Sequence, residues 1–211
     1  MKKSDKTRQF IIEKAAVLFN QKGFNGTSMA DIMAATNMSK GGIYGNFKRD
    51  GMDKNGVKEE IAVAAFEHAV VKVYSEIGQR TRVIDNAVDK LKAVVYFYKE
   101  RVLNPPVEGG CPIQNTSIEA EHNQPILKEK VQEAMLEWHR RVVSTLEKGI
   151  DKGEVDKKID PDEFAMLFIG MIEGGIMGAR IWKSKKPFDS MSTKLLQMIE
   201  ELKPTKIDQT V

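Results

Sequence analysis

Apolar residues recur with the period of an α-helix along nearly the whole chain. Ile12, Ala15, Ala16 and Phe19 fall at i, i+3, i+4 and i+7, and Gly23 follows as a helix stop. No segment shows the sustained alternation of apolar and polar residues that indicates a half-buried strand. The pattern therefore predicts an all-α protein.

Two short helices are predicted after the first one. Ser28 opens one of them, with Asp31 three residues later as a weak capping box. Ser39 caps the next, in which Ile43 and Phe47 lie four residues apart and face the same side. Three short helices with a tight turn between the second and third have helix-turn-helix organisation.

Longer helices are predicted in the rest of the chain. One begins near Val57, an apolar face covers 84–102, and the segment 104–110, with its prolines and glycines, is a clear break. Further helices are expected from Pro112 to before Pro125, on to Gly149 or Gly153, over 162–184, and from Pro187 to about Leu202. The total is about nine helices.

Charge is distributed unevenly along the chain. Residues 1–58 hold 11 Lys/Arg and 5 Asp/Glu, whereas the remainder holds 22 and 25. A basic first quarter on a mildly acidic body favours a polyanionic partner at one end.

The composition favours the cytoplasm. A single cysteine rules out an internal disulfide, and the amino-terminal segment lacks the apolar run of a signal peptide. The apolar window 164–181 has the length of a marginal membrane span. Glu173 and Arg180 within it favour a buried helix of a soluble protein, so we expect no membrane partner.

Motifs for catalysis or metal binding are not apparent. His68, His122 and His139 do not have metal-ligand spacing, and Cys111 with His122 is the only conceivable nucleophile pair. Phosphate-binding glycine loops, paired carboxylates and serine elbows are missing from the sequence. We expect no enzyme, no metal and no cofactor.

The stretch TSMADIMAATNMSKGGIYGNF (27–47), preceded by AAVLFNQKGFNGT, resembles the DNA-binding head of TetR-family transcriptional repressors. The match covers about residues 7–47, and the remainder agrees with the family only in the number and length of its helices. The resemblance implies a DNA-binding domain over 1–56 and a ligand-binding and dimerisation domain over 57–211. It further implies a homodimer that a small-molecule effector releases from a pseudo-palindromic operator in double-stranded DNA.

The resemblance also implies which residues contact DNA. Side-chain-free positions in the third helix let the backbone approach base edges closely. Thr27 would hold a phosphate, Lys40 a phosphate or guanine edge, and Tyr44 a phosphate. Gly45 departs from the more usual aromatic residue, so direct readout would depend on Lys40 and backbone groups. The expected DNA-binding residues are Thr27, Ser28, Ser39, Lys40, Gly41, Gly42, Tyr44, Asn46, Lys48 and Lys58.

An inserted loop at 48–56 separates the third helix from the fourth by more residues than the family usually has. Either this loop has no role, or Arg49 and Lys54 add contacts to the DNA backbone.

In the family, the last two helices pair two subunits, and the glycine-rich helix at 164–181 fits that role. Its small residues permit close helix approach, although a purely intramolecular core helix is the alternative. The expected interface residues are Gly170, Gly174, Gly175, Gly178, Ile176, Met177, Leu195 and Met198.

A ligand pocket is expected in the body of the protein. Its candidate residues are Tyr96, Phe97, Cys111, His122, Met135, Trp138, His139 and Glu173. Each of them could instead be an ordinary core or rim residue. Glu173 could pair with Arg180 or a lysine, or it could face the ligand.

Cys111 raises a further hypothesis because it stands at the expected N-cap of a helix that begins with Pro112. The helix dipole would stabilise a thiolate there, and Gly109 and Gly110 would leave its approach uncrowded. The alternatives are a thiol that senses electrophiles or oxidants and a small buried filler. A more remote alternative is a structural DNA-binding protein without a ligand.

Overall fold

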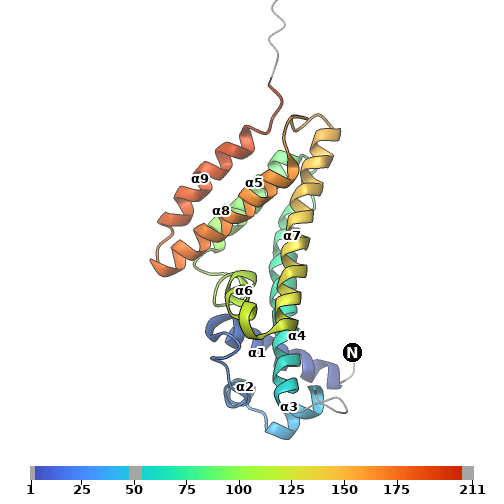
Figure 1. Cartoon of the computed structure of the whole chain (residues 1–211), viewed down its shortest axis with the longest axis vertical. Coiled ribbons are helices and arrows are strands. Elements are labelled where there is room, and N and C mark those ends of the chain that lie inside the picture. The colour runs from blue at the N-terminus through green and yellow to red at the C-terminus, as the bar shows by residue number, and fades with distance from the viewer. Residues whose placement is uncertain (1–2, 48–53, 206–211) are drawn as a thin grey trace, which may run out of the picture. The chain divides into compact units, whose positions relative to one another are not determined.

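The computed structural model describes residues 3–47 and 54–205, and every regular element in these ranges is a helix (Figure 1). The helices are α1 (Lys3–Lys22), α2 (Met29–Thr36), α3 (Lys40–Phe47), α4 (Lys54–Thr81), α5 (Ala87–Arg101), α6 (Pro112–Asn123), α7 (Pro125–Asp151), α8 (Pro161–Ile181) and α9 (Lys186–Glu200). The prediction of an all-α protein with about nine helices is confirmed for the described part of the chain.

Local capping chemistry sets where several helices begin. The Ser28 hydroxyl oxygen accepts a hydrogen bond from the Asp31 N–H at 3.1 Å, and the Ser28 N–H donates to the Asp31 carboxylate at 2.8 Å. This completes the capping box expected at the start of α2. At α8, the carboxylate of Asp160 accepts from two backbone N–H groups of the first turn.

The chain divides into two compact units. The first contains 1–74 and 105–134, and the second contains 75–104 and 135–211. Each unit is therefore built from two separate stretches of sequence. The domain boundary expected after residue 56 follows the roles implied by the family and stays a prediction.

The core of the first unit joins α1, α2 and α3 to α4. Ile43 and Phe47 of α3 are buried, as their spacing predicted. A helix as short as α3 is not stable alone, and burying each large apolar side chain contributes about 1.5–3 kcal/mol. The buried cluster contains Ile11, Ile12, Ala15, Ala16, Ile32, Ile43, Phe47, Val57, Ile61, Ala65, Ala69 and Val107. Tertiary packing therefore holds α3 in place.

In the second unit, α9 packs against α8 and α5 (Figure 1). Phe188, Leu195 and Ile199 of α9 are buried. By length and composition α8 could cross a membrane, the one such helix in the part of the chain that the structure describes. About 44% of its apolar window is buried inside the protein, and a core helix of a soluble protein passes the same test.

Candidate nucleic-acid interface

One face of α3 consists of bare backbone. A Cβ atom added at Gly41 or Gly45 would meet no other atom within 4 Å. Because these residues are four apart, they lie on the same side of the helix. Gly42 is not part of this open side, because a Cβ atom added there would lie 3.2 Å from the methyl carbon of Met38. The open strip therefore runs through Gly41 and Gly45.

Polar side chains border this strip. The Nζ atom of Lys40 lies 5.4 Å from the ring centroid of Tyr44, which is half-buried. The Ser39 hydroxyl accepts from the Gly42 N–H at 3.2 Å. Asn46 donates from its side-chain nitrogen to the Gly42 carbonyl at 2.8 Å, so part of its amide is used within the helix. A cation and a phenol thus remain beside the exposed backbone.

Thr27 does not present free donors to a phosphate in this structure. It is fully buried, and its hydroxyl donates to the Gly23 carbonyl at 2.8 Å. Its backbone N–H points to the Phe24 carbonyl at 3.3 Å. The hydroxyl and the backbone N–H of Thr27 therefore close the turn between α1 and α2 in this structure. A phosphate contact of Thr27 stays a prediction.

Asp31, in the first turn of α2, forms an ion pair with Lys22 at the end of α1. Lys22 donates to the Asp31 carboxylate at 2.7 Å. The hydrogen bond from Lys22, followed by those from Ser28, holds the pKa of Asp31 far below its usual range. The pair lies at the surface, so it serves mainly to fix the end of α1 beside the start of α2.

Lys58 of α4 points to the turn after α1. Its Nζ atom lies 4.2 Å from the ring centroid of Phe24. Burial lowers the pKa of Lys58, and the nearby charge of Glu119 opposes that effect. Lys48 and Arg49 lie outside the described residues. The loop expected over 48–56 ends earlier than predicted, because Lys54 is already the first residue of α4.

An asparagine pair connects α1 with the loop before α6. Asn20 is buried and donates from its side-chain nitrogen to the carbonyls of Glu108 at 2.9 Å and Gly110 at 3.1 Å. Asn115 of α6 donates in turn to the Asn20 side-chain oxygen and to the Gly109 carbonyl, each at 2.9 Å. The last turn of α1 is therefore hydrogen-bonded to the segment that leads into α6.

Glu119 of α6 holds the turn that follows α1. Its carboxylate accepts from the backbone N–H of Phe24 at 2.5 Å and from that of Asn25 at 2.7 Å. These backbone groups have no partner within α1, so the carboxylate satisfies donors that would otherwise be left to solvent. The turn that Glu119 holds lies just before Ser28, the cap of α2.

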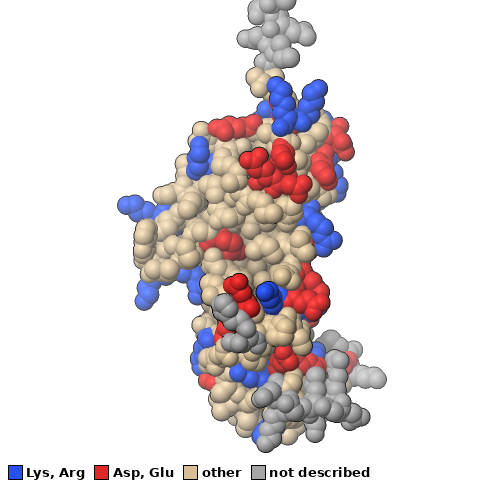
Figure 2. Space-filling model, in the orientation of Figure 1, with Lys and Arg blue, Asp and Glu red and all other residues tan. Residues whose placement is uncertain are grey.

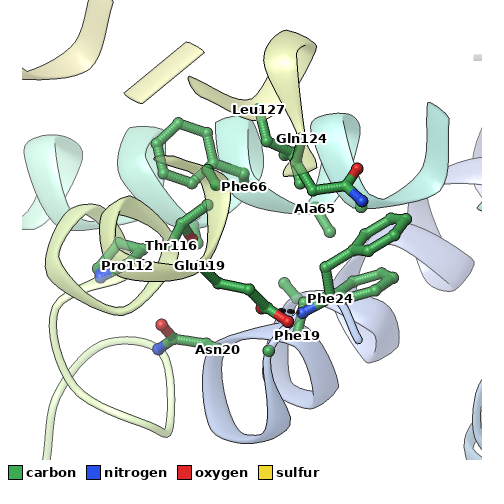
Figure 3. A pocket seen from close by; sticks show the side chains of 15 residues that line it. Phe19, Asn20, Phe24, Ala65, Phe66, Pro112, Thr116, Glu119, Gln124 and Leu127 are labelled. Atoms are coloured by element: carbon green, nitrogen blue, oxygen red, sulfur yellow. Dashed lines mark hydrogen bonds between the residues drawn. The ribbon is translucent and has the colours of Figure 1, made fainter. Parts of the chain in front are cut away.

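A hollow lies among α1, α4 and α6 (Figure 3). Its cavity volume is about 20 Å³, which is room for about one water molecule. The residues that line it are Ala16, Phe19, Asn20, Gly23, Phe24, Ala62, Ala65, Phe66, Ala69, Pro112, Thr116, Glu119, Ala120, Gln124 and Leu127. Sequence reasoning missed this site, because its residues come from three separate stretches and no motif connects them.

The seven candidate pocket residues whose side chains are described do not line this hollow. Phe97 and Trp138 are buried in the second unit, whereas Tyr96 and Met135 are exposed. His139 lies 3.4 Å from the carboxylate of Asp162, and Glu173 is half-buried in α8. The side chain of His122 is not described. A ligand contact for any of these residues stays a prediction.

Cys111 stands at the N-cap of α6, as predicted, and its side chain forms no capping hydrogen bond. The neighbouring Gly109 lies close to α1. A Cβ atom at Gly109 would lie 2.6 Å from the backbone oxygen of Asn20. The reactivity of the thiol stays a prediction.

Four of the expected interface residues serve packing within the subunit. An added Cβ at Gly175 would lie 2.8 Å from the ring of Phe188, and one at Gly178 would lie 2.9 Å from Pro187. Ile176 and Leu195 are buried in the same subunit. The intramolecular alternative therefore describes these four positions. Gly170 and Met177 face outward, and an added Cβ at Gly174 would make only an ordinary contact with Met191, at 3.7 Å.

Charged groups of both signs are scattered over the face shown in Figure 2. In the described part of the chain, no group of three or more His, Cys, Asp or Glu side chains is placed to hold a metal ion.

Comparison with known proteins identifies the family. Residues 11–49 match the family "Bacterial regulatory proteins, tetR family", and residues 87–195 match "Tetracyclin repressor-like, C-terminal domain". A TetR transcriptional regulator from Chloroflexus aurantiacus has a similar structure, with a TM-score of 0.87 and 36% identity, covering 95% of this chain and 98% of that one. A TetR-family regulator from Cytophaga hutchinsonii has a TM-score of 0.85 and 34% identity, covering 98% and 99%. The HTH-type transcriptional repressor DhaR of Mycobacterium sp. (strain GP1) is 23% identical over 196 residues, 91% of each chain. The chain therefore belongs to the TetR family of transcriptional regulators.

Proposed function

We propose that this regulator is a repressor that binds operator DNA through α3 and releases it when a small molecule binds. The observation that carries the proposal is the bare strip at Gly41 and Gly45, bordered by Lys40 and Tyr44. A helix without side chains on one face can bring its backbone close to the major groove, while a flanking cation reaches a phosphate or a guanine edge. Such a regulator would act in the cytoplasm and without catalysis.

We further propose that it acts as a homodimer that pairs through the outer faces of α8 and α9. Exposed apolar side chains follow each other at helical spacing along α8, and the area over these helices is largely uncharged (Figure 2). Apolar patches of this kind mark interaction sites. The exposed positions are Met166, Leu167, Gly170, Met177 and Ile181 of α8 and Met191 of α9.

Selection of binding sites from a random pool of duplex DNA tests the proposal. Two paired half-sites about 34–36 Å apart should be recovered, because each α3 enters one major groove on the same side of the duplex. The affinity for the selected site should fall about 10³-fold or more between 50 and 200 mM salt if several phosphates are contacted. Lys40→Ala should weaken binding and relax base preference, whereas Lys99→Ala in α5 should change neither.

A pool without enrichment, or binding that does not respond to salt, would contradict the proposal.

Release of the operator by an effector can be tested separately, by thermodynamic linkage. An effector that lowers operator affinity by some factor must bind the operator complex more weakly by the same factor. Equal effector affinity with and without saturating operator would exclude this release mechanism.

A further inference from the structure

We infer that Glu119 of α6 is a positioning residue for DNA binding: its carboxylate fixes the turn between α1 and α2, and with it the place from which α2 and α3 approach the operator. The inference rests on the proposed function, because it takes α3 as the helix that binds DNA. Glu119, the turn and α3 all belong to the first unit. The carboxylate therefore acts on operator binding through the turn, without touching DNA.

The turn at 23–26 presents bare backbone to the carboxylate. Phe24 donates its backbone N–H to one oxygen of Glu119 at 2.5 Å (Figure 3), and Asn25 donates to the other at 2.7 Å. Gly23 has a φ of +74°, and a Cβ atom added there would overlap a carboxylate oxygen of Glu119. Gly23 thus leaves the space that the carboxylate fills. Hydrogen bonds to an ionised acceptor are roughly twice as strong as those between neutral groups.

The side chain of Phe24 holds the same turn from two other helices. Its ring stacks on that of Phe19 in α1, with centroids 6.0 Å apart and an interplanar angle of 13°. The Nζ atom of Lys58 in α4 lies 4.2 Å from the centroid of the Phe24 ring, and the charge of Glu119 attracts it as well. The turn is therefore held by α1, α4 and α6 together.

The turn leads directly into the elements expected to contact DNA. Thr27 closes it, Ser28 caps α2, and α2 packs against α1 and α3. If the turn were free, α2 would sample several positions and would lose that freedom on binding DNA, which costs affinity. A turn that is fixed in advance avoids this cost. Loss of the Glu119 carboxylate should therefore weaken operator binding.

Long-range electrostatics alone predicts the opposite result. DNA is a polyanion, so removing a carboxylate from the DNA-binding unit should strengthen binding or leave it unchanged. Glu121 provides this comparison, since it is an exposed carboxylate two residues further along α6. Glu119→Gln and Glu121→Gln remove the same charge, and Glu119→Gln also disrupts the hydrogen bonds to the turn. The sign of the effect on affinity thus separates positioning from charge.

Hydrogen exchange and operator binding of the full chain test the inference. In the free protein, NMR should show at least about tenfold faster exchange of the Phe24 and Asn25 amides in Glu119→Gln, and unchanged exchange in Glu121→Gln. Fluorescence anisotropy with the selected duplex should show about tenfold weaker binding by Glu119→Gln and no weakening by Glu121→Gln. The dependence of affinity on salt should stay that of the wild type, whereas loss of a phosphate contact would lower the slope by about one.

Asn115→Ala is the control for a merely structural role. Asn115 also joins α6 to α1, through hydrogen bonds to Asn20 and Gly109. This variant should melt at a lower temperature and keep its operator affinity wherever it is folded. Equal losses of affinity in Asn115→Ala and Glu119→Gln, unchanged affinity in Glu119→Gln, or unchanged exchange of the turn would overturn the inference alone. A wild-type chain that binds no DNA would refute the proposed function, and the inference with it.

Discussion

Gly41 and Gly45 of α3 have surroundings opposite to those of Gly175 of α8. In α3, a Cβ atom at Gly41 or Gly45 would meet nothing within 4 Å, whereas in α8 one at Gly175 would lie 2.8 Å from the buried ring of Phe188. The first helix uses glycine to keep an outer surface bare. The second uses it to let α9 of the same subunit approach. Glycines at similar helical spacing can therefore expose backbone to another molecule or make room for a helix of the same subunit. Only the surrounding structure shows which of the two applies.

The largest effect on stability is expected at Gly109. Its positive φ favours glycine, and the nearby backbone of Asn20 leaves no space for a side chain. Gly109 has a φ of +113° and touches the backbone of Asn20. Gly109→Ala should lower the free energy of unfolding by about 2–4 kcal/mol, from backbone strain and overpacking together. Gly153→Ala is the matched control, because Gly153 has a φ of +71° and open space around it. Urea denaturation measures both variants. If Gly109→Ala and Gly153→Ala lost the same free energy of unfolding, the contact between Gly109 and α1 would contribute nothing to stability.

A substitution on the exposed face of α8 should affect dimerisation and leave folding unchanged. Met177 is 50% exposed, so Met177→Arg should leave the subunit folded and separate the dimer. Operator affinity should then fall about 100-fold, because two half-sites are no longer bound together. Light scattering after gel filtration measures the mass, and Val83→Arg, at a 78% exposed position between α4 and α5, is the control. A dimer that persists in Met177→Arg would place the interface elsewhere.

The smallest effect is expected on the inner face. Gly175→Ala should destabilise the protein by about 1–3 kcal/mol, because Phe188 is buried and cannot easily give way. Gly78→Ala in α4, with open space around it and outside the proposed dimer interface, should instead stabilise its helix by up to about 1 kcal/mol through helix propensity. Thermal unfolding of both variants in one buffer compares them. Stabilisation by both substitutions would mean that α9 does not constrain α8 at Gly175.

Local chemistry explains why the head was predictable from sequence. The capping box of Ser28 and Asp31 and the pair Ile43 and Phe47 involve residues three or four positions apart, so the sequence itself displays them. The contact between Asn20 and Asn115 joins residues 95 apart, and nothing in either neighbourhood indicates the other. The spacing of the glycines in α8 predicted that another helix packs closely against it. The sequence did not indicate whether that helix belongs to the same subunit or to a second one.

The most direct test of the central claim is operator affinity after the bare strip of α3 is covered. Gly45→Leu adds a side chain where the protein itself has open space, so the fold should be kept and helix propensity improved. Gly78→Leu in α4, also in open space, is the matched control. Fluorescence anisotropy with the selected duplex should show at least about a 100-fold loss for Gly45→Leu, since the backbone can no longer approach the groove, and no loss for Gly78→Leu. Unchanged affinity in a folded Gly45→Leu protein would contradict the assignment of α3 as the helix that reads DNA.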